Sequence, residues 1–140
     1  MEKRTLLRPE YLELMGFTYP GGWPRILLSK EIRHVVADML RELSETILAE
    51  NGLKRRDVRF WVLHSAGRRV IEKAMDVLEL SEGDLRFSRQ VLRNFGNMSS
   101  ATVLFVLDAV LQSKEPRPGD WGVLAALGPG FAAEGLLLRW

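Results

Sequence analysis

With 140 residues and 46% hydrophobic content, the chain has the size of one domain and enough apolar residues for a real core, which excludes a disordered segment. Its 20 Lys and Arg residues against 18 Asp and Glu exclude the dense basic surface that nucleic-acid backbones require, and the absence of cysteine excludes disulfides and thiolate metal sites. No apolar run approaches the roughly 20 residues that cross a bilayer, so we expect a cytoplasmic protein without metal, nucleic-acid or membrane partners.

The first half of the chain predicts one irregular segment, one helix and two strands. Residues 1–24 are predicted to be irregular and to end in a turn that contains two glycines and two prolines, and residues 25–28 then form a short strand. From Ser29, a candidate N-cap, apolar residues recur at helical spacing up to Asn51-Gly52. Residues 59–63 are apolar enough for a strand covered on both faces. We therefore expect a domain over residues 25–140.

The second half predicts three helices followed by two strands. The helices are expected at residues 67–79, 88–95 and 98–113. The last of them has apolar residues on every side of the helical wheel, which predicts a helix that is buried all round. Two strands joined by a Gly-Pro-Gly turn follow, at residues 121–127 and 132–139. Together these elements, which include four located strands, predict an α/β fold with a buried helix and covering helices, and we expect a mixed sheet of about five strands.

Two polar side chains stand where predicted elements meet. His64 follows the buried strand at its carboxyl end, where open α/β sheets present functional groups. Asn97 precedes the all-apolar helix, where free N–H groups and the helix dipole create positive potential. A neutral imidazole and an amide both donate hydrogen bonds without a fixed charge, which suits an oxygen that becomes negative during a reaction. Spacing alone leaves open that His64 is a structural residue and Asn97 only an N-cap.

Three segments carry specific motifs. Residues 61–68 read Trp-Val-Leu-His-Ser-Ala-Gly-Arg, residues 96–105 contain Gly-Asn-Met-Ser-Ser, and residues 121–139 contain Gly-Pro-Gly-Phe. Together they resemble the C-terminal half of the chalcone and stilbene synthases, which are type III polyketide synthases. The resemblance implies a thiolase-like fold of two similar halves with a Cys-His-Asn site between them. The alternative is the related ketoacyl synthases, which carry a histidine and Gly-Asn-x-Ser but lack the Gly-Pro-Gly ending.

The resemblance also implies the chemistry of the two polar residues. By motif, His64 matches the family histidine and Asn97 the family asparagine. In such enzymes a cysteine thiolate takes the starter acyl group from coenzyme A, and the histidine keeps that thiolate ionised. Histidine and asparagine then hold the malonyl thioester oxygen while carbon dioxide leaves. The implied substrates are acyl-CoA and malonyl-CoA, and no metal or redox cofactor is implied.

Further residues are assigned to substrate binding by the same resemblance. The cyclisation pocket is implied to be lined by Ile26, Ser99 and Leu127, with its wall shaped by Gly128, Pro129, Gly130 and Phe131. Plain core packing is the alternative for Ile26 and Leu127. Arg68 and Arg69 begin a predicted helix, where they either lie on solvated surface or meet the phosphates of coenzyme A.

The chain departs from the family in two respects. Many members have His-Pro-Gly-Gly where this chain has His64-Ser65-Ala66-Gly67, which alters the local loop. The half that carries the cysteine is absent, and no serine replaces it because no third group would orient one. We therefore expect a partner, either an N-terminal thiolase-like half with the cysteine or a second copy, because loss of one half uncovers the far side of the helix at residues 98–113.

Three hypotheses for the function follow. The chain is the C-terminal part of a type III polyketide synthase that supplies His64 and Asn97 and is inactive alone, or a noncatalytic interaction or regulatory protein that kept the fold. In the third hypothesis it is a segment of a longer enzyme.

Overall fold

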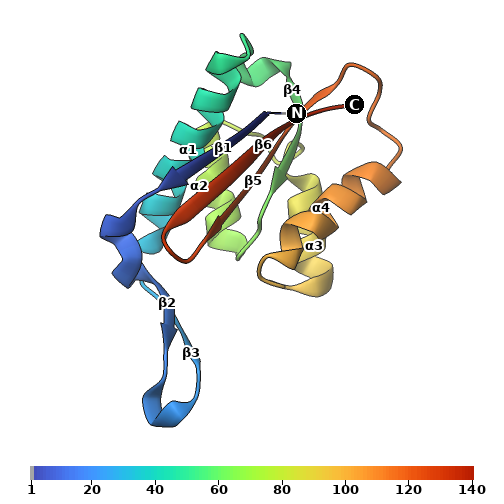
Figure 1. Ribbon diagram of the computed structural model, residues 1–140. Coiled ribbons are helices and arrows are strands. Elements are labelled where there is room, and N and C mark those ends of the chain that lie inside the picture. The colour runs from blue at the N-terminus through green and yellow to red at the C-terminus, as the bar shows by residue number, and fades with distance from the viewer. Residues whose placement is uncertain (1) are drawn as a thin grey trace.

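A mixed sheet with helices on both faces forms the body of the protein in a computed structural model that describes residues 2–140 (Figure 1). The order of its four strands is β1-β6-β5-β4. β4 pairs with β5 in parallel, whereas β6 is antiparallel to both of its neighbours. The strands are β1 (Glu2–Leu7), β4 (Val58–Leu63), β5 (Trp121–Gly128) and β6 (Ala132–Arg139).

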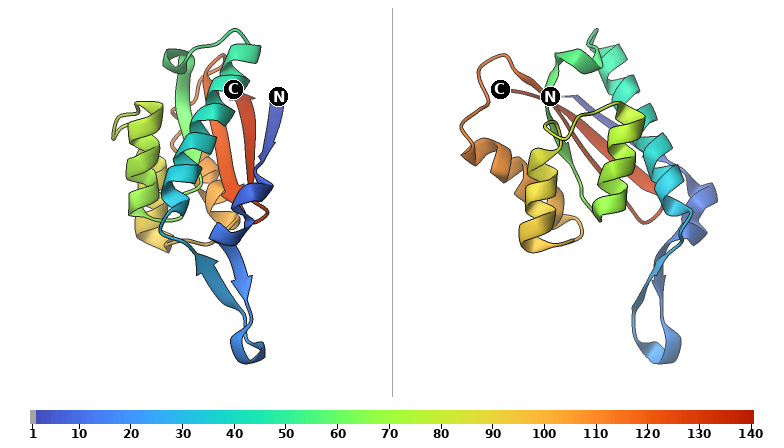
Figure 2. Two further views of the ribbon diagram at one scale, coloured as in Figure 1. Left: turned by 90° about the vertical axis from the view of Figure 1, so that its left-hand side faces the viewer. Right: turned by 180° about the vertical axis from the view of Figure 1, so that it is seen from behind.

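Four helices cover this sheet, and they are α1 (Ile32–Glu50), α2 (Arg68–Leu78), α3 (Arg86–Phe95) and α4 (Ala101–Gln112). α1 and α2 lie over one face, and α4 lies over the other with α3 beside it (Figure 2). α1 ends as predicted at Asn51-Gly52, where Gly52 has a φ of +67° and the Asn51 side chain donates to the Ile47 carbonyl (2.8 Å). It begins at Ile32 rather than directly after Ser29, because residues 30–31 form a turn.

β4 is buried on both faces, which confirms the prediction from its apolar sequence. Phe60 and Val62 pack into the hydrophobic cluster under α4, whereas Trp61 and Leu63 pack into the cluster under α1 and α2. Alternate side chains of a strand point to opposite faces, so a strand with an apolar residue at each of these positions is stable only between two layers. The burial of β4 between the two helix layers fixes where its carboxyl end lies.

The prediction that residues 1–24 are irregular is wrong at two places. Residues 2–7 form β1 along the edge of the sheet, with Leu6 packed against the core. Their charged sequence hides the strand from a hydrophobic pattern, and charged residues are a common feature of edge strands. The ion pair of Arg4 with Glu50 and the hydrogen bond from Arg8 Nη2 to Glu42 Oε1 (2.7 Å) hold this segment against α1.

The second exception is a hairpin arm formed by β2 (Met15–Thr18) and β3 (Arg25–Leu28). The predicted strand at residues 25–28 is present, but it pairs with β2 in a separate two-stranded sheet, so the main sheet has four strands rather than five. The arm projects from the body (Figures 1 and 2). Its exposed large apolar side chains are Phe17, Tyr19, Trp23, Ile26 and Leu27. Short 3₁₀ turns occupy Pro9–Leu14, Pro20–Gly22 and Arg55–Asp57.

α4 is buried on one side only, although its sequence is apolar on every side. Val103, Val106 and Val110 face the sheet and are buried. On the other side Leu104, Phe105 and Leu111 are 62%, 42% and 49% exposed. Phe95 of α3 packs edge-on against Phe105, with 5.2 Å between ring centroids. We call Phe95, Leu104, Phe105 and Leu111 the outer face of α4, and it is the uncovered far side that we expected from the sequence.

Within residues 2–140, no helix has both the length and the apolar content needed to cross a membrane.

Close packing of α1 on β6 yields a test of the fold. A Cβ added to Gly135 would lie 2.7 Å from Cδ1 of Ile47 and 2.9 Å from Cδ2 of Leu43. Gly135→Ala should therefore lower the free energy of unfolding by about 1–3 kcal/mol through overpacking. Denaturant unfolding measures this loss. Gly16→Ala is the control, because a Cβ there meets nothing within 4 Å, and equal stability of the two variants would contradict this packing.

Candidate active site

Three segments meet at one end of the sheet, where the parallel strands β4 and β5 have their carboxyl ends. His64 directly follows β4, and its backbone N–H donates to the Ala125 carbonyl (2.9 Å), which extends the ladder by one residue. β5 ends at the same edge in the turn at residues 128–130, and the loop that leads into α4 lies at this end too (Figure 1). The carboxyl ends of parallel strands are the usual place for a site in an open α/β sheet.

The His64 ring is half-buried and electrically neutral. Strand alternation continues from Phe60 and Val62, so the ring lies on the α4 side of the sheet. Burial lowers the pKa of His64 below its ordinary value of 6.5, because a desolvated imidazolium is unfavourable. Nδ1 is buried and makes no hydrogen bond to any described residue. Ser44 Oγ is also buried without a partner, so Nδ1 is one of a few such atoms in the described chain.

The Asn97 amide is oriented by the loop before α4. Its Oδ1 accepts a hydrogen bond from the Ser99 backbone N–H (2.9 Å). Because that N–H can only donate, the amide must turn its oxygen toward Ser99, which leaves Nδ2 directed away as a donor. Asn97 is not the N-cap, since α4 begins at Ala101 with Ser100 in the cap position. Ser99 has a φ of +58°, which interrupts the helix that we predicted from residue 98.

The residues assigned to the substrate pocket separate into two groups. Ser99, Pro129 and Gly130 are exposed at the end of the sheet that carries His64, beside the half-buried Gly128. Phe131 is 0% exposed in the core on the α1 side, where its ring meets Tyr11 edge-on at 6.1 Å, and Leu127 packs into the same cluster. These two side chains therefore have a packing role in the described chain. Ile26 is 75% exposed on the arm, which excludes core packing for it.

Arg68 and Arg69 lie at the start of α2, as predicted, and both are exposed. Arg68 forms an ion pair with Glu72 (3.2 Å). It also lines a groove of about 690 Å³ between α2 and α3, whose other cationic residues are Arg86, Arg89 and Arg93. Sequence reasoning missed this groove, because its arginines face one another only after α2 and α3 pack together.

Two buried serines, also missed, hold the backbone on either side of His64. Ser88 Oγ of α3 donates to the Leu63 carbonyl (3.0 Å), and Ser65 Oγ donates to the Ser88 carbonyl (3.2 Å). Both serines are 0% exposed. The sequence contains one weak indication of this role, a polar residue on the apolar side of a helix. Ser88 falls three residues before Val91 on the buried side of α3, where a polar residue needs a hydrogen-bond partner.

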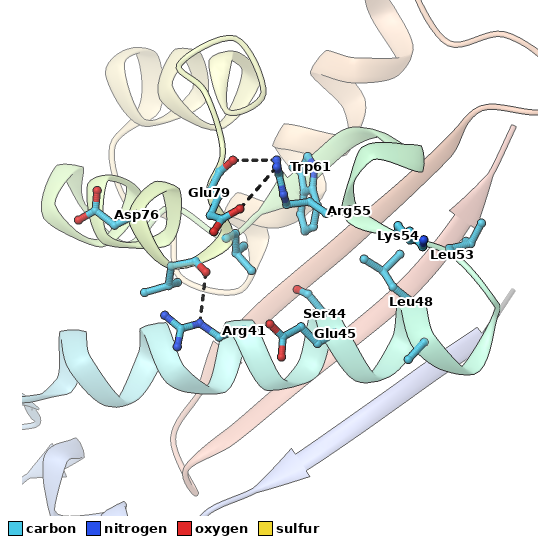
Figure 3. A pocket seen from close by; sticks show the side chains of 13 residues that line it. Arg41, Ser44, Glu45, Leu48, Leu53, Lys54, Arg55, Trp61, Asp76 and Glu79 are labelled. Atoms are coloured by element: carbon cyan, nitrogen blue, oxygen red, sulfur yellow. Dashed lines mark hydrogen bonds and ion pairs between the residues drawn. The ribbon is translucent and has the colours of Figure 1, made fainter.

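A second groove, of about 570 Å³, lies between α1 and the end of α2 (Figure 3). The C-terminal half of α1, residues 53–55 and the end of α2 line it, with Trp61 among the lining residues. Arg55 Nη1 donates to the Glu79 carbonyl (2.7 Å) and Arg41 Nε to the Val77 carbonyl (3.2 Å). These arginines tie the end of α2 to its neighbours, so the groove is structural. Across the described chain, no group of three or more acidic or histidine side chains is arranged to hold a metal ion.

Comparisons with known proteins show which proteins the chain is similar to. A family model described as "Chalcone and stilbene synthases, C-terminal domain" matches residues 23–140. The chain is 40% identical over 134 residues to 1,3,6,8-tetrahydroxynaphthalene synthase of Streptomyces peucetius subsp. caesius, covering 96% of the chain and 36% of the relative. It is 37% identical over 113 residues to 3,5-dihydroxyphenylacetyl-CoA synthase of Amycolatopsis balhimycina, covering 81% of the chain and 30% of the relative.

Solved structures show the same similarity. PKS-I from the brown alga Ectocarpus siliculosus matches with a TM-score of 0.89 and 32% identity, over 99% of the chain and 38% of that protein. The 1,3,6,8-tetrahydroxynaphthalene synthase of Streptomyces coelicolor A3(2), a bacterial type III polyketide synthase, matches with a TM-score of 0.87 and 29% identity, over 99% and 40%. The chain thus spans 40% or less of the length of these relatives.

Burial of His64 gives a test by titration. Because its pKa in the folded protein lies below 6.5, the unfolded chain binds more protons here as the pH falls below that value. The free energy of unfolding should therefore decrease as the pH is lowered through this window, until His64 is also protonated in the folded state. The decrease should be smaller in His64→Gln. Proton NMR of the imidazole, assigned with His64→Gln, should give a midpoint below 6.5. A midpoint at or above 6.5 would contradict the burial.

Proposed function

The chain belongs to the chalcone and stilbene synthase family, and we propose that it supplies His64 and Asn97 to a decarboxylative condensation of coenzyme A thioesters. Its fold is thiolase-like, as in the type III polyketide synthases it resembles. The family match favours these synthases over the ketoacyl synthases. The observation that carries the proposal is the His64 ring, which burial keeps neutral and whose buried Nδ1 finds no partner among the described residues.

The nucleophile in this proposal is the cysteine of an N-terminal thiolase-like half, because the chain itself has none. His64 accepts the thiol proton, and the resulting imidazolium keeps the thiolate ionised. The thiolate attacks the carbonyl carbon of the starter thioester. The new C–S bond forms as the bond to coenzyme A breaks, which leaves the starter acyl group on the cysteine. The His64 imidazolium gives its proton to the leaving thiolate, so coenzyme A departs as its thiol and His64 is neutral again.

The second substrate is a malonyl thioester, and its decarboxylation is the step that needs donors. As carbon dioxide leaves, the electron pair moves onto the α-carbon and the thioester oxygen becomes negative. His64 and the Asn97 amide stabilise that oxygen by donating hydrogen bonds. Asn97 suits this role because Ser99 already holds its Oδ1, which leaves Nδ2 oriented before the substrate arrives. The α-carbon then attacks the acyl-cysteine, a C–C bond forms, and the thiolate is regenerated.

The substrates approach, in this proposal, along the edge that carries His64. The turn at residues 128–130 and Ser99 border the growing polyketide, and Ile26 reaches the pocket from the arm. Arg68 and Arg69 bind the phosphates of coenzyme A in this proposal. In the groove between α2 and α3, Arg86 and Arg89 are paired with Glu115 and Glu82, so the available positive charge there is that of Arg93, which forms no ion pair within residues 2–140.

The outer face of α4 is where the cysteine-bearing half binds in this proposal. Phe105 and Leu104 expose apolar surface at the centre of α4, and exposed apolar patches mark interfaces. The relatives are more than twice as long as this chain, so a further half of comparable size is the occupant that fits. The apolar arm provides a second surface for the same partner. A second copy of this chain is the alternative occupant.

Asn97→Ala tests the catalytic role. In a mixture of the chain with a cysteine-bearing N-terminal half from a relative, release of carbon dioxide from malonyl-CoA should appear only when both are present. Asn97→Ala should lower kcat by about 100-fold or more, as expected for loss of one oxyanion donor. Asn94→Ala, an exposed asparagine on α3, is the matched control and should leave kcat unchanged. Assembly without condensation would instead favour a noncatalytic interaction protein.

Phe105→Glu tests the interface. A charge at the centre of the outer face of α4 should weaken binding of the N-terminal half by about 2 kcal/mol or more, the scale of an interface hot spot. Isothermal titration calorimetry measures this loss. Ala49→Glu adds the same charge at an exposed position of α1, on the other side of the sheet, and is the control. Equal binding by the two variants would exclude the outer face of α4 as the interface, and dimerisation of the chain alone would identify a second copy as its occupant.

A further inference from the structure

β4 is an edge strand of the sheet, and its free edge ends in a hydrogen bond from α3. The sheet order places β5 on one side of β4 and no strand on the other. The last carbonyl of β4, that of Leu63, accepts the hydroxyl proton of Ser88 (3.0 Å). The Ser88 side chain therefore provides the hydrogen bond that a neighbouring strand would otherwise donate, and it does so at the residue immediately before His64. Full burial of Ser88 excludes water as a competing donor.

The same residue of α3 also binds the chain immediately after His64. Ser65 Oγ donates to the Ser88 carbonyl (3.2 Å), and the Ser65 side chain is likewise fully buried. The two bonds run in opposite directions between the same pair of segments. They therefore prevent both sliding and rotation of the three residues that have His64 at their centre.

α3 connects this point to the second polar residue of the site. From Ser88 the helix continues to Phe95, where the Gly96 N–H donates to the Leu92 carbonyl (2.9 Å) and closes the last turn. Asn97 follows directly. A short, regular helix thus joins the residue that binds both neighbours of His64 to the residue that carries the amide.

We infer that Ser65 and Ser88 are positioning residues that hold His64 at a fixed place relative to Asn97. The role of this positioning in catalysis rests on the proposed function, whereas the two hydrogen bonds are part of the structure. Ser65 donates from the loop and Ser88 donates from the helix, so the segment on each side of His64 has its own hydrogen bond to α3.

Chemical modification of the two histidines tests the inference without any need for activity. Diethyl pyrocarbonate acylates accessible neutral imidazoles, and His34, exposed on α1, serves as the internal reference for the half-buried His64. Mass spectrometry gives the ratio of the two rates in the full chain. Ser88→Ala and Ser65→Ala should each raise the His64 to His34 ratio about fivefold, the population change expected when one hydrogen bond is lost.

Three variants separate local positioning from general stability. Ser88→Thr keeps the hydroxyl and should restore a ratio close to that of the unmodified chain. Ser44→Ala removes another buried serine, whose Oγ has no partner in the described chain, and should not change the ratio. Ile47→Val loosens the core between α1 and the sheet, away from His64, and should also leave the ratio unchanged.

An unchanged ratio in a folded Ser65→Ala variant, or an equal rise in Ile47→Val, would overturn the inference. Ser65→Ala decides the matter if Ser88→Ala does not fold, because Ser65 lies in a loop and not in a helix. The proposed function fails by a different result, namely condensation that survives His64→Gln in the assembled enzyme. That result would leave the measured ratios, and hence the positioning, intact.

Discussion

Burial of β4 between two layers of helices is the constraint on which the candidate site depends. Successive side chains from Phe60 to Leu63 pack alternately into the hydrophobic clusters on the two faces of the sheet. Burying one such side chain stabilises the fold by about 1.5–3 kcal/mol. The carboxyl end of the strand is therefore held firmly, and His64 with it. The same burial desolvates the imidazole and lowers its pKa, so that packing determines both the position and the charge of the ring.

Two features of the protein that lack a partner in the described chain lie on the same side of the sheet. His64 lies on the α4 side by strand alternation, its Nδ1 lacks a partner within the described chain, and the outer face of α4 exposes Leu104 and Phe105. The α1 side, in contrast, is closed by a large cluster that includes Phe131. In the proposed function, a single polypeptide that covers α4 would also reach the site, so one partner would account both for the exposed apolar face and for the missing nucleophile.

Elements with strong periodicity or specific motifs could be predicted from the sequence. β4, α2 and the final hairpin of β5 and β6 lie within a residue or two of their expected bounds. β1 could not be predicted, because its charged residues serve an edge and its stability comes from pairing with β6, which is distant in the chain. The core position of Phe131 was also out of reach, since an apolar residue after a turn does not reveal which face of the sheet it joins.

The candidate site shows the same limit at closer range. Motifs predicted His64 and Asn97 as candidates, and they stay a prediction. The left-handed backbone at Ser99, which delays the start of α4, and the hydrogen bond from Ser99 to the Asn97 amide depend on local geometry that composition does not encode. Ser65 and Ser88 are separated by 23 residues and meet only because α3 packs against the edge of β4. Hydrogen bonds between distant segments become visible only in three dimensions.

The most direct test of the account is the pKa of His64 before and after the chain binds a cysteine-bearing N-terminal half. The account predicts that the pKa rises on binding, because a nearby thiolate stabilises the imidazolium. It also predicts that the rise is absent when the cysteine of that half is replaced by serine. A His64 pKa that stays at its value in the free chain after binding would show that His64 does not lie beside the nucleophile, and would contradict the account.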